Sequence, residues 1–239
     1  MPRRRKQQKR RKGRRSFLYF GVGFFVFFLI AALLIGIPAV MALMHDLPKL
    51  EEENFLSLGQ TSRIYAADGS LLAEIYETEN RTVVPLAAIP DYLKQGTIAI
   101  EDERFYEHSG VDYEAIGRAA VTDLSRGRMA EGGSTITQQL VKKVYLSDER
   151  SFTRKFVEAV LATELERTAS KDTILERYLN TIYYGENAYG VEAAAQTYFG
   201  KSVTQLDLAE CALLAGLPQA PSAFSPKMDL AAATERRDV

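Results

Sequence analysis

Apolar and polar residues recur with two different periods along the chain, and the change falls near residue 90. Before it, two short apolar runs, Thr61–Tyr65 and Leu71–Tyr76, flank the polar turn 67–70. An Asp-Gly turn between two such runs predicts a β-hairpin. A third short run, Thr82–Leu86, predicts another extended segment. The pattern therefore predicts a β connector over residues 45–90.

From Tyr92 onward, apolar residues recur with helical spacing almost without interruption. The predicted helices fall in segments 93–100, 113–124, 135–145, 151–167, 171–184, 191–198, 206–217 and 230–239. Ser151 and Ser170 are placed to cap two of these helices, and Gly185 is placed to end the second. The period predicts a mainly α domain over residues 91–230. Because the last helix breaks off without Gly or Pro, we expect 231–239 to begin a truncated C-terminal continuation.

The longest apolar segment lies near the N-terminus. Phe17–Met44 is a run of 28 residues without a charged side chain, and a helix needs roughly 20 such residues to cross a bilayer. A cleaved secretory signal is the alternative, but its apolar region spans only about 7 to 15 residues. The length favours an uncleaved transmembrane anchor over residues 16–44.

Charge is distributed unevenly between the tail and the rest of the chain. Residues 1–15 carry ten Lys or Arg and no acid, while the whole chain has a net charge of −1, which leaves −11 for residues 16–239. The excess of cations before the apolar segment places the basic tail in the cytoplasm and the domain outside. It favours contact with anionic lipid and gives no reason to expect a nucleic-acid site on the folded part.

The single cysteine and the two histidines narrow the chemistry further. Cys211 has no partner for an internal disulfide, and its Ala/Leu-rich surroundings predict a small buried hydrophobic residue and not a nucleophile. Neither His45 nor His108 has a second His or Cys at metal-ligand spacing. The sequence therefore gives no sign of a zinc site.

Three segments carry candidate chemistry, and the first is acidic. Four acids surround two aromatic residues at the end of an apolar helix: Glu101, Asp102, Glu103 and Glu107 around Phe105 and Tyr106. A carboxylate beside these rings would be partly desolvated, which raises its pKa and suits it to proton transfer. A solvated acidic turn is the more common explanation of such an acidic pair taken alone, so the cluster is judged together with the segments that follow.

The second segment begins a predicted helix. Gly132-Gly133-Ser134-Thr135 offers backbone amides and hydroxyls at the positive end of the helix dipole, which is typical of a phosphate site. Ser134 could equally be an ordinary N-cap. The polar side chains that follow favour the phosphate interpretation: Gln138, Lys142, Lys143 and Arg150.

The third segment places a carboxylate at the edge of an apolar helix face. Helical spacing sets Glu158 beside Leu161, Ala162 and Leu165. A carboxylate there needs a cationic partner or a function. Arg154, one turn earlier, suffices as a structural partner, so the residues alone leave both explanations open.

Together with two later segments, these stretches resemble the peptidoglycan glycosyltransferases of glycosyltransferase family 51. Five family motifs appear in order over roughly residues 95–226. The first two are matched by Glu101, Asp102, Phe105, His108 and Gly110, then by Gly132, Ser134, Thr135, Gln138 and Gln139. The third and fourth are matched by Arg154, Lys155, Glu158, Ala162, Leu165 and Glu166, then by Lys171, Ile174, Leu175, Glu176, Tyr178, Leu179, Asn180 and Gly185. The fifth falls on Leu206, Glu210, Ala215, Pro218, Pro221 and Pro226, with Phe224 where the family often has Tyr.

The connector also resembles the approach to this domain in class A penicillin-binding proteins, in which a transpeptidase domain follows. We therefore expect the chain to be the N-terminal portion of such a protein. No Ser-x-x-Lys motif occurs in these 239 residues, so no penicillin-binding activity is predicted for them.

The resemblance implies a lysozyme-like glycosyltransferase domain that polymerises lipid II by inverting transfer, with the growing lipid-linked glycan strand as its second substrate. It implies Glu101 as general base and Glu158 as a second catalytic carboxylate. The implied substrate contacts are Arg118, Ser134, Thr135, Gln138, Gln139, Lys142, Arg150 and Arg154. A divalent cation, Mg²⁺ or Mn²⁺, is implied as a cofactor, with Glu158 as its candidate ligand. The implied location is the bacterial cytoplasmic membrane, in a single pass, with other cell-wall synthesis proteins as partners and no nucleic acid.

Two alternatives from other classes remain. A membrane-anchored lytic enzyme would cleave finished peptidoglycan with one catalytic acid, and would not require the Gly-Ser-Thr segment, Lys142 and Arg150. A non-catalytic scaffold for wall synthesis could lose Glu101 or Glu158 freely, yet the sequence retains both.

Overall fold

The computed structural model describes residues 61–75, 79–126, 133–146 and 152–238, with a few isolated positions before residue 61. Contacts divide the chain into two units, 1–47 and 48–239, and only the second is described at length. The predicted anchor 16–44 lies almost wholly outside the described residues. Within the described part, no helix combines the length and the apolar character needed to cross a membrane.

The predicted hairpin is present. β1 (Ser62–Tyr65) pairs antiparallel with β2 (Leu71–Ile75). Asp68 organises the turn, because its Oδ1 accepts hydrogen bonds from the backbone nitrogen of Ser70 at 2.9 Å and from its hydroxyl at 2.6 Å. Gly69 has a φ of +85°, a conformation that glycine adopts without steric cost.

The predicted extended run Thr82–Leu86 is not a strand, which corrects the sequence prediction. The strand is β3 (Asn80–Arg81), which pairs in parallel with β4 (Ala188–Tyr189), a strand that the sequence pattern did not predict. Val84, within the predicted run, pairs with a side chain instead. The amide of Asn180 accepts from the Val84 nitrogen at 2.9 Å and donates to its carbonyl at 2.8 Å. The side chain therefore takes the place of a neighbouring strand.

The rest of the described chain is mainly helical, as predicted. The helices are α3 (Asp91–Glu101), α4 (Tyr113–Arg126), α5 (Ile136–Tyr145), α6 (Phe152–Thr168), α7 (Lys171–Thr181), α8 (Val191–Phe199), α9 (Leu208–Gly216) and α10 (Leu230–Arg237). Two short 3-10 helices, η1 (Leu86–Ala88) and η2 (Val203–Gln205), complete the elements.

Helix α7 ends earlier than its sequence pattern predicts. Ser170 caps its start as expected, accepting from the Thr173 nitrogen. The helix stops at Thr181 and not at Tyr184, because the Tyr184 nitrogen donates to the Ala188 carbonyl at 2.9 Å. The backbone beyond Thr181 therefore closes a turn onto β4, and Gly185, with a φ of +92°, lies inside that turn.

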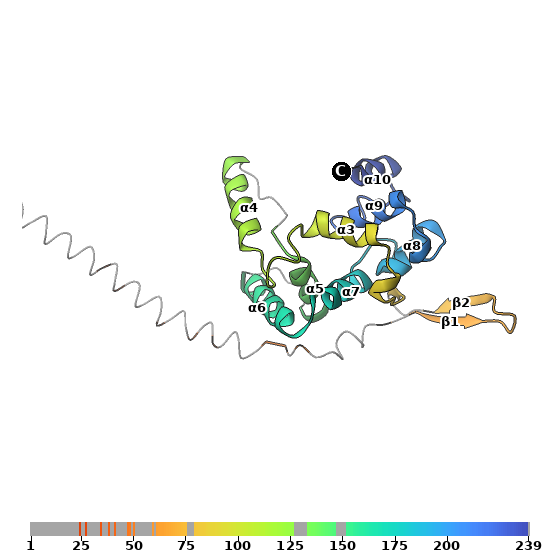
Figure 1. Ribbon diagram of the computed structural model, residues 1–239, viewed down its shortest axis with the longest axis horizontal. Helices are drawn as coiled ribbons and strands as arrows, with labels where there is room; N and C mark the ends of the chain where they lie inside the picture. The colour runs from red at the N-terminus through yellow and green to blue at the C-terminus, as the bar shows by residue number, and fades with distance from the viewer. Residues whose placement is uncertain are drawn as a thin grey trace, which may run out of the picture. The chain divides into compact units, whose positions relative to one another are not determined.

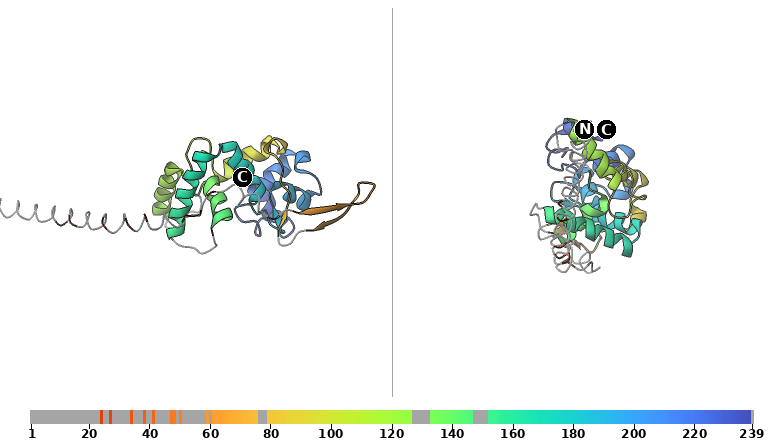
Figure 2. Two further views of the ribbon diagram at one scale, coloured as in Figure 1. Left: turned by 90° about the horizontal axis from the view of Figure 1, so that it is seen from below. Right: turned by 90° about the vertical axis from the view of Figure 1, so that its left-hand side faces the viewer.

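The helices pack in two adjoining groups. In one group α5 contacts both α6 and α7, and in the other α3 lies against α9, which contacts α10 (Figure 1). The views in Figure 2 also show α3 beside the C-terminal helices. The approach of α3 to α9 is close, since a Cβ at Gly96 would lie 3.2 Å from the Ala215 Cβ. Since α3 carries Glu101 and α5 carries Gln139, the candidate chemistry lies where the two groups meet.

Cys211 on α9 is a buried free cysteine, in agreement with the prediction. Burial raises the pKa of its thiol to about 11. Since only the thiolate is a good nucleophile, Cys211 serves packing.

Candidate active site

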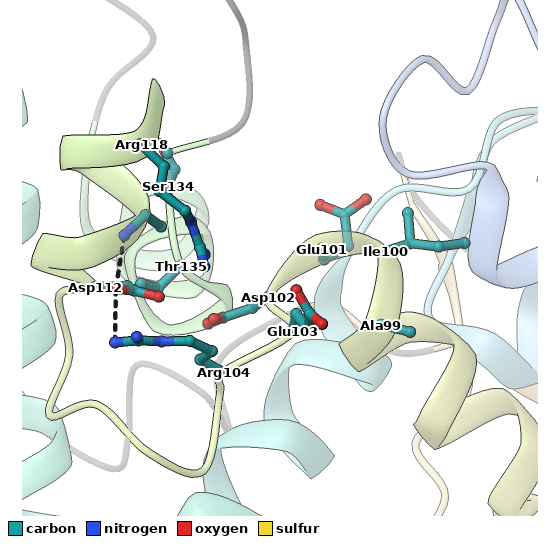
Figure 3. Close-up of a pocket in the computed structure, with 12 residues that line it drawn as sticks. Ala99, Ile100, Glu101, Asp102, Glu103, Arg104, Asp112, Arg118, Ser134 and Thr135 are labelled. Atoms are coloured by element: carbon teal, nitrogen blue, oxygen red, sulfur yellow. Dashed lines mark hydrogen bonds and ion pairs between the residues drawn. The ribbon is translucent and has the colours of Figure 1, made fainter. Parts of the chain in front are cut away.

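A polar pocket of about 190 Å³ opens between the end of α3, the start of α4 and the segment before α5. Figure 3 shows Glu101 and Asp102 on one side of it and Arg118, Ser134 and Thr135 on the other. The structure thus brings together the first and second candidate segments, which lie about thirty residues apart in the chain.

Glu101 is the last residue of α3 and is half-buried at the edge of this pocket. Its Oε2 accepts a hydrogen bond of 2.8 Å from Nε2 of Gln139 on α5. Burial raises the pKa of its carboxyl, opposed by the Gln139 hydrogen bond and by the charge of Arg236. A carboxylate that is fixed in orientation and more basic than usual is suited to accept a proton.

The neighbouring acid, Asp102, points inward and has a structural role. Its two oxygens lie 3.0 and 2.9 Å from Nε2 of His108, and its Oδ2 also accepts from the Ile136 nitrogen at 3.0 Å. Asp102 therefore fixes the start of α5 next to the end of α3. Of the two explanations for the acidic cluster, proton transfer fits Glu101, while Asp102 is held by its own hydrogen bonds.

The Gly-Ser-Thr segment forms the start of α5, but Thr135, and not Ser134, is the N-cap. The Thr135 hydroxyl accepts from the Gln138 nitrogen at 3.1 Å, and the Gln138 side chain accepts from the Thr135 nitrogen at 2.9 Å. Thr135 also donates to the Gly110 carbonyl at 2.6 Å. These bonds form a buried capping box, which occupies the side chains of Thr135 and Gln138.

Ser134 links the pocket to the third candidate segment. Its hydroxyl accepts a hydrogen bond of 2.8 Å from Nζ of Lys155, and that ammonium also lies 2.7 Å from Oε2 of Glu158. Glu158 is only 1% exposed, and its Oε1 lies 3.1 Å from Nε of Arg154. The sequence left open whether Glu158 has a cationic partner. The structure shows two, Arg154 and Lys155.

The other predicted substrate contacts are distributed around these groups. Arg118 on α4 and Lys142 on α5 are both exposed, but only Arg118 lines the pocket. The described candidates that do not line this pocket are Gln138, Gln139, Lys142, Arg154 and Glu158. Arg150 lies outside the residues that the structure describes.

The surroundings of Glu158 do not favour a divalent cation. Glu158, the candidate ligand, already faces two cations at 3.1 and 2.7 Å, which would repel a metal ion. Asp112 in the pocket wall forms an ion pair of 3.1 Å with Arg104. Across the described ranges, no group of three or more His, Cys, Asp or Glu side chains could hold a metal.

Comparison with known proteins identifies the domain. A sequence profile described as "Transglycosylase" matches residues 68–239, which is more than half of the chain. The chain belongs to the transglycosylase family. This match confirms the predicted family and its enzyme class, peptidoglycan glycosyltransferase.

Relatives of this transglycosylase chain are longer proteins. It is 47% identical over 188 residues to penicillin-binding protein 1A of Neisseria lactamica, an alignment that covers 79% of this chain and 23% of the relative. It is 43% identical over 205 residues to penicillin-binding protein 1F of Bacillus subtilis, covering 86% of this chain and 28% of the relative. The chain thus spans about a quarter of the length of these relatives.

A solved structure, penicillin-binding protein 1A from Haemophilus influenzae, is similar to this chain with 31% sequence identity. The comparison has a TM-score of 0.40 and covers 76% of this chain and 17% of that chain. The mainly helical class is established by the elements themselves, and the lysozyme-like arrangement stays a prediction.

The surroundings of Glu101 also include residues that the sequence analysis did not assign to the site. Tyr178 is fully buried on α7, and its hydroxyl donates to Oε1 of Gln139 at 3.2 Å. The charge of Arg236 on α10 lowers the pKa of the Glu101 carboxyl. Burial, together with the charge of Glu101, raises the pKa of Tyr184, which is also fully buried. Tyr178 lies within the fourth motif, but no spacing rule connects it to Glu101, 77 positions earlier.

Proposed function

We propose that this chain polymerises lipid II into glycan strands by inverting glycosyl transfer, with release of undecaprenyl pyrophosphate. Membership of the transglycosylase family supports the reaction class. The 28-residue apolar segment and the basic tail before it support a single-pass anchor in the cytoplasmic membrane, with the domain outside. An anchored domain can remain at the bilayer surface where a lipid-linked substrate resides.

Glu101 is the general base in this proposal. The observation that carries it is a half-buried carboxylate at a pocket edge, fixed by Gln139 and with a raised pKa. Gln139 engages Oε2, so Oε1 is the oxygen that accepts the proton of the acceptor sugar's 4-hydroxyl. As the acceptor's 4-hydroxyl oxygen bonds to the donor's anomeric carbon, the bond from this carbon to the pyrophosphate oxygen breaks on the opposite face.

The departing pyrophosphate gains negative charge, which preorganised cations and donors stabilise. Lys155, held between Ser134 and Glu158, and Arg118 in the pocket wall are the described groups that support this role beside the pocket. Lys142, Arg150 and Arg154 remain family-based candidates for the same task. Glu158 acts as a positioning residue, because its buried carboxylate holds Arg154 and Lys155 in place.

Replacing Glu101 with glutamine tests the proposal. Glu101→Gln removes the proton acceptor and keeps the shape, so we expect polymerisation to fall about 10² to 10⁴-fold. The measurement is glycan strand formation from labelled lipid II by the full chain in detergent. Glu107→Gln is a matched control, because Glu107 lies in the same acidic cluster but is 71% exposed and outside the pocket lining; we expect it to keep full activity.

The same preparations separate the alternatives. A lytic enzyme would release muropeptides from finished peptidoglycan and form no strands from lipid II. A scaffold would show neither activity. Substantial strand formation by Glu101→Gln would reject Glu101 as the base.

A further inference from the structure

Glu101 is connected to the interior of the domain by two hydrogen bonds in series. Gln139 donates from Nε2 to Oε2 of Glu101 at 2.8 Å, and its Oε1 accepts from the Tyr178 hydroxyl at 3.2 Å. The three residues come from α3, α5 and α7, so the connection spans three elements. Tyr178 is fully buried, which leaves its hydroxyl little freedom to turn elsewhere.

We infer that Tyr178 is a positioning residue for the general base: its hydroxyl fixes the amide of Gln139 so that the NH₂ group, and not the carbonyl, faces Glu101. The inference rests on the proposed role of Glu101. In this inference Gln139 orients the general base and does not bind the substrate.

The chemistry of the amide explains why this anchor matters. A glutamine side chain has an acceptor end and a donor end of nearly the same shape. With the carbonyl toward Glu101, two oxygen acceptors would face each other, and the carboxylate would be disfavoured in its ionised form. The phenol donates to the carbonyl end, so the donor end remains directed at Oε2. Burial raises the pKa of Tyr178 well above its usual value, so the phenol remains a neutral donor throughout the working range.

Other charged and titratable groups act on Glu101 from several elements. Arg236 on α10 favours its ionised form, whereas the adjacent Asp102 disfavours it. Tyr178 and Tyr184 are neutral and buried. The pocket wall adds Glu103, Arg104, Asp112 and Arg118. Among these surroundings, the Gln139 hydrogen bond lowers the carboxyl pKa more than the Arg236 charge does.

The first test removes one oxygen atom. Tyr178→Phe keeps the ring and frees the Gln139 amide to rotate, so the carboxylate loses part of its donor. We expect kcat for strand formation to fall about tenfold, because weakening the Gln139 bond to the charged carboxylate costs about as much as one hydrogen bond. KM for lipid II should change little. Because the Gln139 bond lowers the Glu101 pKa, its loss raises that pKa, and the acidic limb of the kcat profile moves to higher pH.

Tyr183→Phe is the matched control. Tyr183 lies five residues after Tyr178, beyond the end of α7. Its ring packs against Tyr189, 4.9 Å away between ring centroids. We expect it to leave kcat and the pH profile unchanged. Equal kcat and equal acidic limbs for Tyr178→Phe and Tyr183→Phe would overturn the inference.

A double-mutant cycle separates positioning from packing. If Tyr178 acts only through the amide, then Tyr178→Phe should cost activity in the wild-type background and almost nothing in a Gln139→Leu background. Fully additive losses would reject the inference. Gln139→Leu by itself should move the acidic limb in the same direction as Tyr178→Phe. If circular dichroism shows that Tyr178→Phe does not fold, Gln139→Leu alone carries the test, and an unchanged acidic limb in that variant would overturn the inference.

The outcomes also distinguish this inference from the proposed function. If the wild-type chain forms no strands, or if Glu101→Gln remains active, the proposed function fails. If wild type is active and Glu101→Gln is inactive, but neither Tyr178→Phe nor Gln139→Leu shifts the pH profile, only the positioning role fails.

Discussion

Gly110 occupies a position where the packing against α6 excludes a Cβ atom. It has a φ of +92°, and a Cβ at this position would lie 2.6 to 2.8 Å from backbone atoms of Ala162 and Thr163 on α6. Its carbonyl oxygen also accepts from the buried Thr135 hydroxyl. The first motif therefore ends in glycine because α6 leaves no room for a side chain.

Gly110→Ala is accordingly expected to lose about 2 to 4 kcal/mol of unfolding free energy, from left-handed strain and backbone collision together. Urea denaturation measures the loss. Gly117→Ala is the control, since no atom lies within 4 Å of its Cβ position on α4; it should stabilise by about 1 kcal/mol. Equal stability of the two variants would contradict the close packing on α6.

The ionised form of Glu101 should lower the free energy of unfolding at neutral pH. Burial raises its pKa, so the native state binds this proton more tightly than the unfolded chain does, and the associated stability is lost as pH rises through the raised pKa. Glu101→Gln imitates the neutral carboxyl. We expect its Tm to exceed that of wild type at pH 7 and the difference to vanish below the unfolded pKa near 4. A lower Tm at pH 7 would mean that the ionised carboxylate stabilises the fold.

At the scale of elements, the start of α5 organises the site. Thr135 caps the helix, Asp102 accepts from its first backbone nitrogen, and Gln139 lies one turn further on against Glu101. Ser134 at the same end meets Lys155 of α6. A shift of this helix would move both sides of the pocket together.

Thr135→Val tests the capping box. Valine keeps the shape but removes the acceptor for the Gln138 nitrogen and the donor to Gly110, so we expect a loss of about 2 to 3 kcal/mol in denaturant unfolding. Ser170→Ala removes the exposed cap of α7 and should cost only about 0.5 to 1 kcal/mol. Similar losses for both would argue against a special role for the buried cap.

At the scale of the whole molecule, Cys211 reports on global opening. It is the only thiol in the chain and is fully buried on α9, a helix that packs against α3, α8 and α10. Its raised pKa, about 11, keeps it in the thiol form near neutral pH.

We therefore expect Cys211 to react with a disulfide reagent only when the domain unfolds. At pH 8 the labelling rate of the native chain should be at least about 10³-fold below that in urea, in line with the small open fraction of a stable domain. The rate should rise at the same urea concentration at which circular dichroism reports unfolding. Rapid labelling under native conditions would show that α9 detaches locally.

Local patterns predicted much of this molecule. Helical periodicity located all eight helices of the described chain, and the Asp68–Gly69 turn located the hairpin, because both depend on neighbours a few residues apart. The predictions failed where another group replaced the expected hydrogen-bond partner. Asn180 pairs with the Val84 backbone in place of a strand, and Ala188 receives the hydrogen bond of Tyr184 that a longer α7 would have kept.

By itself, the sequence determined the family, the mainly helical class, the asymmetric charge and the identity of the acid to examine, since motifs and periodicity are properties of the chain order. Only the tertiary structure decided the task of each polar residue. It separated Glu101, at a pocket edge, from Asp102, turned inward on His108, and it joined Tyr178 to Gln139 across 39 positions. Hydrogen-bond partners depend on distances of about 3 Å, and such distances between remote segments exist only once the helices have packed.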